Sequence, residues 1–384
     1  MKRIYIVVIF FVVALLYFGI FYHSNYQIFN YFLPLADAMI HGRIDITPNP
    51  ALNELVPSAG KYFVVYPPMP AVILIPFTLI FGSSFNQAIA SILIAAASVS
   101  IFYLLATRFT KRLWVQILMT ILFAFGTNFS FSALIGSAWH FAHIIAVFFL
   151  LLALLESTGK KRPIIIGFLY SAAFMARLPV FLAFPIFLYL ILKDSRRDQI
   201  VKKLMLFFVP VVFILGLFGI YNFVRFGSFF QTGYSLIPGV LQEPWYKYGI
   251  FSVHYISRQL QAIFLSMPKF SVHFPYFLPT SYAMALWLTT PALFLLFGVR
   301  TKDKYSVVFL LTALLIALPS LMHGTVGFSQ FGYRFSLDFI VFLLLPLIAV
   351  FERIGWKIAG IFVAVSMAIN LWVAILYVLV IFKT

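Results

Sequence analysis

The sequence predicts an all-α, polytopic membrane protein with about eleven transmembrane helices. Of its 384 residues, 63% are hydrophobic and only 10% are charged, and the mean hydropathy is +1.04. A soluble chain of this length could not hide so much apolar surface, because its outer shell must be polar. Apolar segments of about 20 residues recur along the chain, and each is long enough to cross the hydrocarbon layer of a bilayer.

Helices are predicted for these segments because backbone polar groups in hydrocarbon must be paired within the protein. The alternating pattern of a membrane β-barrel is missing. The predicted spans are 4–22, 86–107, 113–127, 139–155, 163–175, 180–192, 204–221, 280–299, 306–321, 335–350 and 358–382. With no internal repeat and no linker, residues 1–384 are predicted to form a single domain.

The first span follows Met1, Lys2 and Arg3, so it resembles the start of a signal peptide. Its apolar run to Tyr22 is too long for a typical signal core, and no small-residue cleavage site follows it. We therefore interpret it as a retained first transmembrane helix.

The distribution of positive charge predicts the orientation. The net charge is +17, and Lys and Arg gather in cytoplasmic loops of membrane proteins. With a cytoplasmic N-terminus, and with the proline-rich segment 67–82 kept outside as a half-buried or re-entrant helix, 18 of the 27 Lys and Arg lie inside. This pattern predicts a multi-pass protein of the cytoplasmic membrane that binds no nucleic acid. The absence of cysteine excludes disulfides and thiolate metal sites.

The external segments carry the polar residues that could perform chemistry. Long external loops are predicted at 23–66 and 222–279, and all seven histidines fall outside. The first of these loops begins with an amphipathic stretch, 27–41, which predicts an interfacial helix with Asp37 on its polar side.

Acidic residues are few on the outer side, which makes each a candidate base. A general base needs a carboxylate within hydrogen-bond reach of the acceptor hydroxyl. Asp37 is the first candidate and Asp45 the second, although Asp37 could equally be a solvated residue on a polar helix face. Glu54 and Glu243 are predicted to face water.

Basic and histidine side chains could bind an anionic substrate. Arg177 interrupts an apolar run, where a charge is expensive and usually functional, although it could also extend to the lipid headgroups. His140 and His143 lie three residues apart, a spacing that fits hydrogen bonding to phosphate or sugar, a plain interfacial position, or a metal if a third ligand existed. Arg334 and Asp338, four residues apart, suggest a local ion pair.

Four stretches of the chain resemble the bacterial GT-C membrane glycosyltransferases. They are Asn30 to Asp45, Gly60 to Ala71 with its Tyr-Pro-Pro sequence, Asn222 to Ser228 with Gly233 and Tyr234, and Gln330 to Asp338. The resemblance covers about residues 25–350. It implies an enzyme that moves a sugar from a polyprenyl-phosphate carrier to an acceptor outside the cytoplasm. Relatives include protein O-mannosyltransferases and the aminoarabinose transferases of lipid A.

The resemblance implies a base in the first external loop and basic residues that bind the carrier phosphate. Family members place an acid near the end of the first span, whereas this chain has His23, Ser24, Asn25, Tyr26 and Gln27 there. The catalytic role is therefore assigned to Asp37 or Asp45. The residues predicted to bind substrate are Asn30, Arg43, Lys61, Tyr62, Tyr66, His140, His143, Arg177, Arg225, Tyr333, Arg334 and Asp338.

This reading predicts a polyprenyl-phosphate-linked sugar and an acceptor as partners, beside membrane lipids, and no cofactor. A single base acting on the acceptor would invert the configuration at the sugar. Two other functions stay open: a lipid or solute transporter, which is disfavoured because no repeat is evident and the charges gather at one face, and a non-catalytic membrane scaffold.

Overall fold

The computed structural model describes residues 2–22, 29–49, 51–280, 283–328 and 330–377. The chain is mostly helical, with 69% of residues in helices and 5% in strands, so the predicted helical class is confirmed. Positions 23–27, where the resemblance would have placed an early acid, lie outside the described residues.

Six helices in the described residues are long and apolar enough to cross a membrane. They are α1 (Lys2–Ile20), α4 (Gln87–Phe109), α7 (Ala138–Ser157), α10 (Arg197–Phe226), α13 (Lys304–Leu321) and α16 (Trp356–Leu376). A bent pair, α5 (Leu113–Phe125) and α6 (Phe129–Ile135), meets at 45° and would make a seventh span. Together these helices make the chain a helical membrane protein.

Shorter elements fill the remaining predicted positions. The apolar ones are α2 (Phe32–Ile40), α3 (Met69–Phe81), α8 (Pro163–Phe174), the 3₁₀ helix η1 (Leu178–Ala183) and α9 (Phe184–Leu192). Within the segment 27–41, predicted as an interfacial helix, residues 32–40 form α2. Its apolar side chains, including Phe32 and Leu35, are buried, and it packs on α3. The proline-rich segment 67–82 forms α3, which is too short to count among the six spans.

Two of the predicted spans are broken rather than continuous. Segment 280–299 contains α12 (Leu286–Thr289) and η6 (Pro291–Gly298), and segment 335–350 contains η7 (Arg334–Asp338), α14 (Ile340–Leu344) and the start of α15 (Leu347–Ile354). Pro291 and Pro346 sit at the breaks. Proline lacks an N–H and clashes with the preceding turn, so it interrupts the α-helical ladder.

The rest of the chain forms small elements. They are β1 (Leu55–Ser58) and β2 (Lys61–Val64), which pair antiparallel; η2 (Tyr234–Leu236), η3 (Val240–Gln242), η4 (Pro244–Tyr246), η5 (Val253–Tyr255) and α11 (Ile256–Phe264); and the antiparallel pair β3 (Lys269–Phe270) and β4 (Phe277–Leu278). Ala59 and Gly60, both with positive φ, form the turn between β1 and β2.

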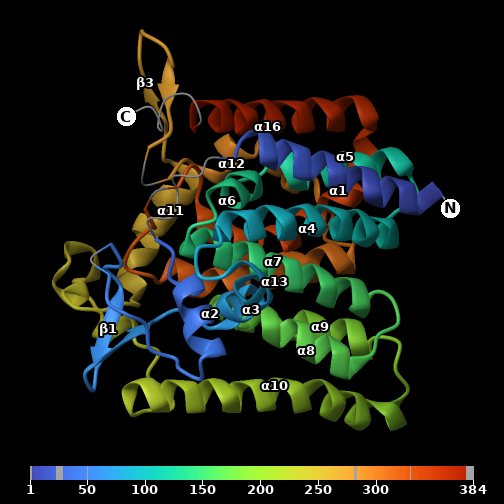
Figure 1. The fold of residues 1–384 in the computed structure, drawn as a ribbon. Helices are drawn as coiled ribbons and strands as arrows, with labels where there is room; N and C mark the ends of the chain where they lie inside the picture. The colour runs from blue at the N-terminus through green and yellow to red at the C-terminus, as the bar shows by residue number, and fades with distance from the viewer. Residues whose placement is uncertain (1, 23–28, 50, 281–282, 329, 378–384) are drawn as a thin grey trace.

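The long helices lie roughly side by side (Figure 1), with α4 and α7 near the centre and α10 along one edge. The outward side of α10 exposes large apolar side chains such as Val212 and Phe213. A water-facing helix would carry polar residues there, so we interpret this surface as lipid-facing.

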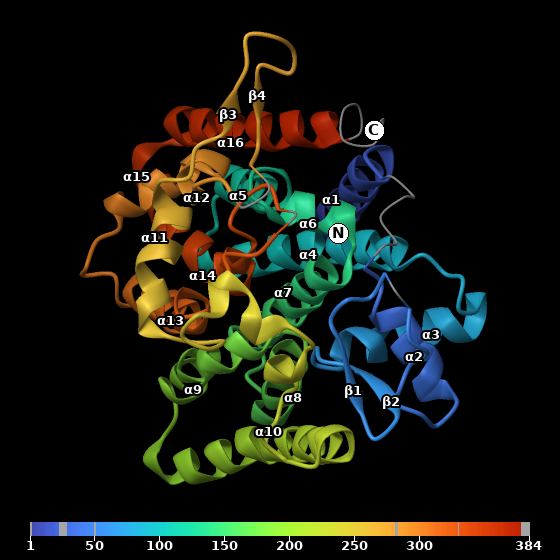
Figure 2. The same cartoon turned by 90° about the vertical axis from the view of Figure 1, so that its left-hand side faces the viewer.

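The two ends of the helix bundle differ. Figure 2 shows one end face on, with β1, β2, α11 and the irregular segments gathered around the start of α7; we call it the loop-bearing end. The opposite end holds the last turn of α4, which contains Arg108, and the short turns after α7 and α9, which contain Lys161 and Arg196.

Candidate functional site

A buried ion pair joins three segments at the start of α7. Asp338, at the end of η7, is fully buried. Its carboxylate accepts two hydrogen bonds from Arg177, from Nε at 3.1 Å and from Nη2 at 2.9 Å, and lies 2.8 Å from His143 Nδ1. A carboxylate held by a guanidinium fork is ionised, so His143 Nδ1 carries the proton and donates.

The local sequence explains how these groups meet. Pro179 follows Arg177 by two residues and starts η1, so the chain turns after α8 and leaves Arg177 in an extended conformation between two apolar helices. His143 lies one turn into α7, on the side that contacts η7. The side chain of Arg177 is only 17% exposed and that of Asp338 is not exposed at all.

Arg334 lies beside this ion pair but is not bonded to Asp338, so the predicted local ion pair is wrong. Residues 334–338 form a 3₁₀ helix, which has three residues per turn, and residues four apart do not share a face in that geometry. Arg334 instead donates to the carbonyl oxygen of Phe328 at 2.8 Å, and its guanidinium lies 5.5 Å from the ring centres of both Trp139 and Phe335.

Two buried nitrogen atoms in this region have no hydrogen-bond partner within the described residues. They are Nε of Arg334 and Nε2 of His143. Buried polar groups are nearly always hydrogen-bonded in native proteins, to protein, water or ligand. Both atoms are therefore available to water or to a polar ligand.

Glu54 was expected to face water, but it is only partly exposed and its carboxylate is hydrogen-bonded to the protein. Trp139 Nε1 donates to Glu54 Oε2 at 3.0 Å and to the hydroxyl of Tyr66 at 2.5 Å, and the Glu54 backbone N–H donates to the hydroxyl of Tyr31. Burial raises the pKa of Glu54 to about 7, although the Trp139 hydrogen bond and the charge of Arg334 act in the other direction.

Loops from the second half of the chain complete the surroundings. Tyr234, in η2, lies near Tyr66, with ring centres 6.1 Å apart, and interacts electrostatically with Arg177, Arg334 and Glu54. His323 follows α13, and its ring stacks edge-on against Phe335 at 5.7 Å. Burial lowers the pKa of His323 to about 4, so the ring is neutral.

We call the side chains that meet here the polar cluster: Glu54, Tyr66, Trp139, His143, Arg177, Tyr234, Arg334 and Asp338. The cluster lies at the loop-bearing end, where α7 begins (Figure 2). Tyr66, His143, Arg177, Arg334 and Asp338 were predicted from the sequence, whereas Glu54, Trp139 and Tyr234 were not assigned roles. The Trp139 and Tyr234 positions fall within stretches already singled out, but nothing in the sequence indicated their contacts.

Tyr333 and His140 make structural contacts next to the cluster. The buried hydroxyl of Tyr333 donates to Gln259 Oε1 at 2.8 Å, and its carbonyl oxygen accepts from Asn128. His140 Nδ1 lies 2.9 Å from the hydroxyl of Ser132 in α6, so His140 and His143 bond with different elements. Among the described residues, no group of three or more His, Cys, Asp or Glu could hold a metal ion.

Arg225 is almost fully buried near the end of α10. It donates to Asn222 Oδ1 at 2.6 Å and to the carbonyl oxygen of Val64, and its guanidinium lies 3.9 Å from the ring centre of Tyr221. These contacts tie α10 to β2. Arg225 also interacts electrostatically with Tyr234, which places it at the edge of the polar cluster.

The residues predicted in α2 have different surroundings. Asn30 accepts a hydrogen bond from the backbone of Leu33 at 3.2 Å, at the start of α2. Within the described residues the Asp37 carboxylate has no hydrogen bond or ion pair, while its carbonyl oxygen bonds with His41 Nδ1 at 2.8 Å.

A second charged group lies on the surface of the first loop. Asp45 pairs with Lys61 at 3.2 Å and with Arg43 at 3.5 Å, and both basic side chains are at least half exposed. Tyr62, in β2, is also exposed. These four predicted residues therefore lie together, and within the described residues no hydrogen bond or ion pair joins them to the polar cluster. Exposed pairs of this kind contribute little to stability.

Comparison of the chain with protein-family models, with curated proteins and with solved structures gives no match.

Proposed function

We propose that this protein is a membrane glycosyltransferase that moves a sugar from a polyprenyl-phosphate carrier to an acceptor outside the cytoplasm. The observation that carries this proposal is the polar cluster. In it, Arg334 interacts electrostatically with Glu54, whose pKa is about 7, and with Arg177, which is held by Asp338. The cluster lies at one end of a helical membrane protein. The order of motifs that resemble the GT-C family supports the same function.

Arg334 and Arg177 are the proposed ligands of the donor phosphate. Arg334 offers its unpartnered Nε, and Arg177 uses only two of its three nitrogens on Asp338. Guanidinium groups bind phosphate oxygens through two parallel hydrogen bonds. Asp338 and His143 then act as positioning residues, because their bonds hold Arg177 in place.

Glu54 is the proposed general base, in preference to Asp37 and Asp45. Both oxygens of Asp338 are occupied by Arg177 and His143, and Asp45 is neutralised by its ion pairs. A base works best when its pKa is near the operating pH, and Glu54 meets that condition. Asp37 stays the alternative base in the first loop.

In the proposed reaction, Glu54 takes the proton of the acceptor hydroxyl, and the hydroxyl oxygen attacks the anomeric carbon. The bond from that carbon to the carrier phosphate breaks, and the phosphate leaves with the bonding electrons, stabilised by the arginines. A single displacement inverts the sugar. Since Glu54 and Tyr234 belong to loops, we propose that these loops move aside to admit the donor.

The proposed topology has a cytoplasmic N-terminus and an extracytoplasmic polar cluster. Eleven crossings require the shorter and broken elements to span as well. A 12-residue helix such as α8 is only about 18 Å long, less than the thickness of the hydrocarbon layer. It could cross only where neighbouring protein shields its ends.

The direct test is release of polyprenyl phosphate from a polyprenyl-phosphate-linked sugar by the purified protein in proteoliposomes. We expect release with the wild type and a loss of about 100-fold or more for Glu54→Gln. Asp45→Asn serves as the matched control, because its ion pairs lie on the surface. Movement of the lipid across the bilayer without sugar transfer would favour a transporter. A protein that neither transfers the sugar nor moves the lipid, but binds other membrane proteins, would favour a scaffold.

A further inference from the structure

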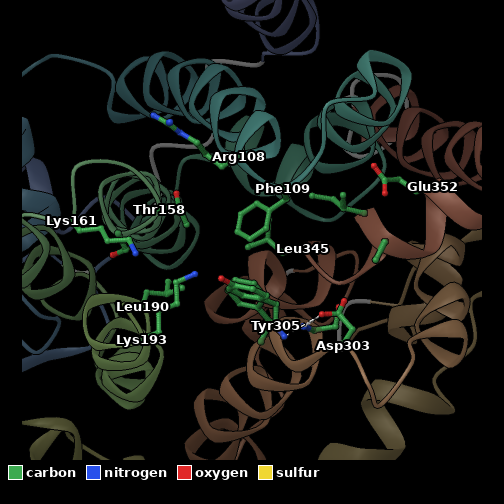
Figure 3. Close-up of a pocket in the computed structure, with 15 residues that line it drawn as sticks. Arg108, Phe109, Thr158, Lys161, Leu190, Lys193, Asp303, Tyr305, Leu345 and Glu352 are labelled. Atoms are coloured by element: carbon green, nitrogen blue, oxygen red, sulfur yellow. Dashed lines mark hydrogen bonds between the residues drawn. The ribbon is translucent and has the colours of Figure 1, made fainter. Parts of the chain in front are cut away.

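A cavity of about 380 Å³ lies at the end of the molecule opposite the polar cluster. It is enclosed by the ends of α4, α7 and α9, the start of α13, and α14–α15 (Figure 3). Its volume is within the range of about 300–1,000 Å³ that is usual for small-molecule sites. Nothing in the proposed sugar transfer uses this cavity.

One wall of the cavity is cationic. Arg108 ends α4, Lys161 lies in the turn after α7, and Lys193 follows α9. Within the described residues Arg108 has no hydrogen bond or ion pair, and a Cβ placed on Gly159 would lie 3.4 Å from its guanidinium nitrogen, so Arg108 leans on the same turn as Lys161. Three cations from separate elements thus face one space.

These cations are crowded. Burial lowers the pKa of Lys193, and the nearby charge of Lys161 adds to this effect, while Asp194 opposes it. Asp194 pairs with Lys161 on the solvent side, and the ammonium of Lys193 lies 4.3 Å from the ring centre of Tyr305. An anion between the cations would relieve their repulsion.

The other wall carries two carboxylates. Asp303 caps α13 by accepting from the backbone of Tyr305 at 3.2 Å and from the hydroxyl of Ser306 at 2.6 Å. Glu352, in α15, accepts from the hydroxyl of Thr110. These bonds fix both carboxylates, and a carboxylate has about four acceptor positions, so each keeps room for a further donor.

The two walls are separated by apolar groups. Figure 3 shows Arg108, Lys161 and Lys193 on one side, Asp303 and Glu352 on the other, and Phe109 and Leu345 between them. The cavity therefore has a positive side and a negative side. A ligand that matches it carries an anion and a cation a few bonds apart, on a body with some apolar surface.

We propose that this cavity binds the headgroup of phosphatidylethanolamine, with the phosphate against Arg108, Lys161 and Lys193 and the ammonium against Asp303 and Glu352. The cavity lies where the bundle's helices end, the depth at which headgroups sit. Phosphatidylglycerol would bring its phosphate to the cations but offer the carboxylates only neutral hydroxyl donors, which make weaker hydrogen bonds than an ammonium. Phosphatidylcholine carries a positive charge without N–H groups, so it would make no hydrogen bond there.

The test is native mass spectrometry of the full-length protein with equal amounts of dioleoyl phosphatidylethanolamine, phosphatidylcholine and phosphatidylglycerol. We expect the wild type to retain phosphatidylethanolamine about tenfold over each of the other lipids, which corresponds to one charge-assisted hydrogen bond. Ratios near one in the wild type would overturn the proposal.

Substitutions in the cationic wall and in the carboxylate wall show how each contributes to the lipid selectivity. Glu352→Gln keeps the side-chain shape and should bring the ratio of phosphatidylethanolamine to phosphatidylglycerol close to one. The double variant Arg108→Gln and Lys193→Gln should lose both lipids. Lys202→Gln, which removes an exposed positive charge on α10 outside the cavity lining, is the control and should behave like the wild type. An unchanged lipid ratio in Glu352→Gln would contradict the proposed ammonium contact.

Soluble O-phosphoethanolamine distinguishes a lipid ligand from a free phosphate compound. The apolar groups of the cavity would contact the glycerol region of a lipid, so we expect the soluble compound to displace the lipid only at concentrations at least about 100-fold higher. Equal binding of the soluble compound would show that the ligand is not a lipid.

Discussion

At the scale of single residues, the environment of Glu54 distinguishes it from the other acids of the first loop. Asp45 pairs with two basic side chains, whereas the Glu54 carboxylate accepts a hydrogen bond from the indole N–H of Trp139. Burial disfavours the charged carboxylate, so its pKa rises to about 7. Such a carboxylate changes charge near neutral pH and can take up a proton during a reaction.

The raised pKa of Glu54 predicts a pH dependence. A base must be ionised to accept a proton, so transfer by the wild type should increase about tenfold per pH unit below pH 7 and level off above it. The measurement is the initial rate of polyprenyl phosphate release between pH 5 and 9. Glu54→Gln should lose this rise together with the activity. A rate that does not change around pH 7 would contradict the role of Glu54 as the base.

Asp338 should be required for stability as well as for positioning Arg177. Asp338→Asn removes a charge that is fully buried and leaves the Arg177 guanidinium without its partner. Breaking one side of a buried ion pair usually costs about 3–5 kcal/mol, so the melting temperature in detergent should fall by roughly 5–10 °C. Asp194→Asn, which breaks the exposed pair with Lys161, should leave it unchanged. Equal melting temperatures for both variants would contradict a structural role of the buried pair.

The sequence singled out five residues that meet in the polar cluster, but it did not indicate their contacts. Arg177 was conspicuous because a charge inside an apolar run needs a partner. Its partner, Asp338, is 161 positions away, and no local pattern indicates such a pairing. The i, i+4 spacing of Arg334 and Asp338 suggested a pair that would form in an α-helix and does not form in the 3₁₀ helix found there. Glu54 was misjudged because its burial comes from segments distant in sequence.

At the scale of elements, glycines allow the close approach of two helices. The α8 residue Gly167 faces α10: a Cβ there would lie 2.3 Å from the carbonyl oxygen of Phe207 and 2.7 Å from Pro210 Cγ. Both partners are part of a helix and cannot give way easily. Because Gly167 has no side chain, α8 and α10 can pack closely at this position.

Gly167→Ala should destabilise the protein by about 1–3 kcal/mol, because the extra methyl group forces the two helices apart. The matched control is Gly216→Ala in α10, where no atom lies within 4 Å of the new Cβ. The control should be neutral or slightly stabilising, since alanine favours helices over glycine. Thermal unfolding in detergent separates the two variants, and equal losses would contradict this packing.

The positions of long helices were predictable because about 20 consecutive apolar residues leave few alternatives to a helix. Segments 4–22, 86–107 and 139–155 correspond closely to α1, α4 and α7. Segments 280–299 and 335–350 are also largely apolar, but they contain Pro291 and Pro346. They fold as short helices. Hydropathy alone does not show whether such prolines kink a span or break it, since neighbouring helices decide how the freed carbonyls are satisfied.

At the scale of the whole molecule, the two ends have distinct roles in our account. The loop-bearing end holds the polar cluster, and the opposite end holds the cationic turns and the cavity (Figures 1 and 3). Positive turns stay on the cytoplasmic side of membrane proteins. The proposed orientation therefore places sugar transfer outside and lipid-headgroup binding inside.

Reporter fusions test this orientation. A reporter fused after Lys160, in the turn that follows α7, should report a cytoplasmic position, and one fused after Gln231, in the loop that follows α10, an external one. A cytoplasmic signal from the second fusion, or an external signal from the first, would contradict the proposed orientation.

The central claim is that the polar cluster transfers a sugar from a lipid phosphate. Its most direct test is a single-turnover assay in proteoliposomes with a radiolabelled polyprenyl-phosphate sugar, comparing the wild type with Glu54→Gln and Arg334→Gln. We expect sugar transfer and polyprenyl phosphate release by the wild type, with release reduced about 100-fold or more in each variant. Release by both variants at the wild-type rate would contradict it.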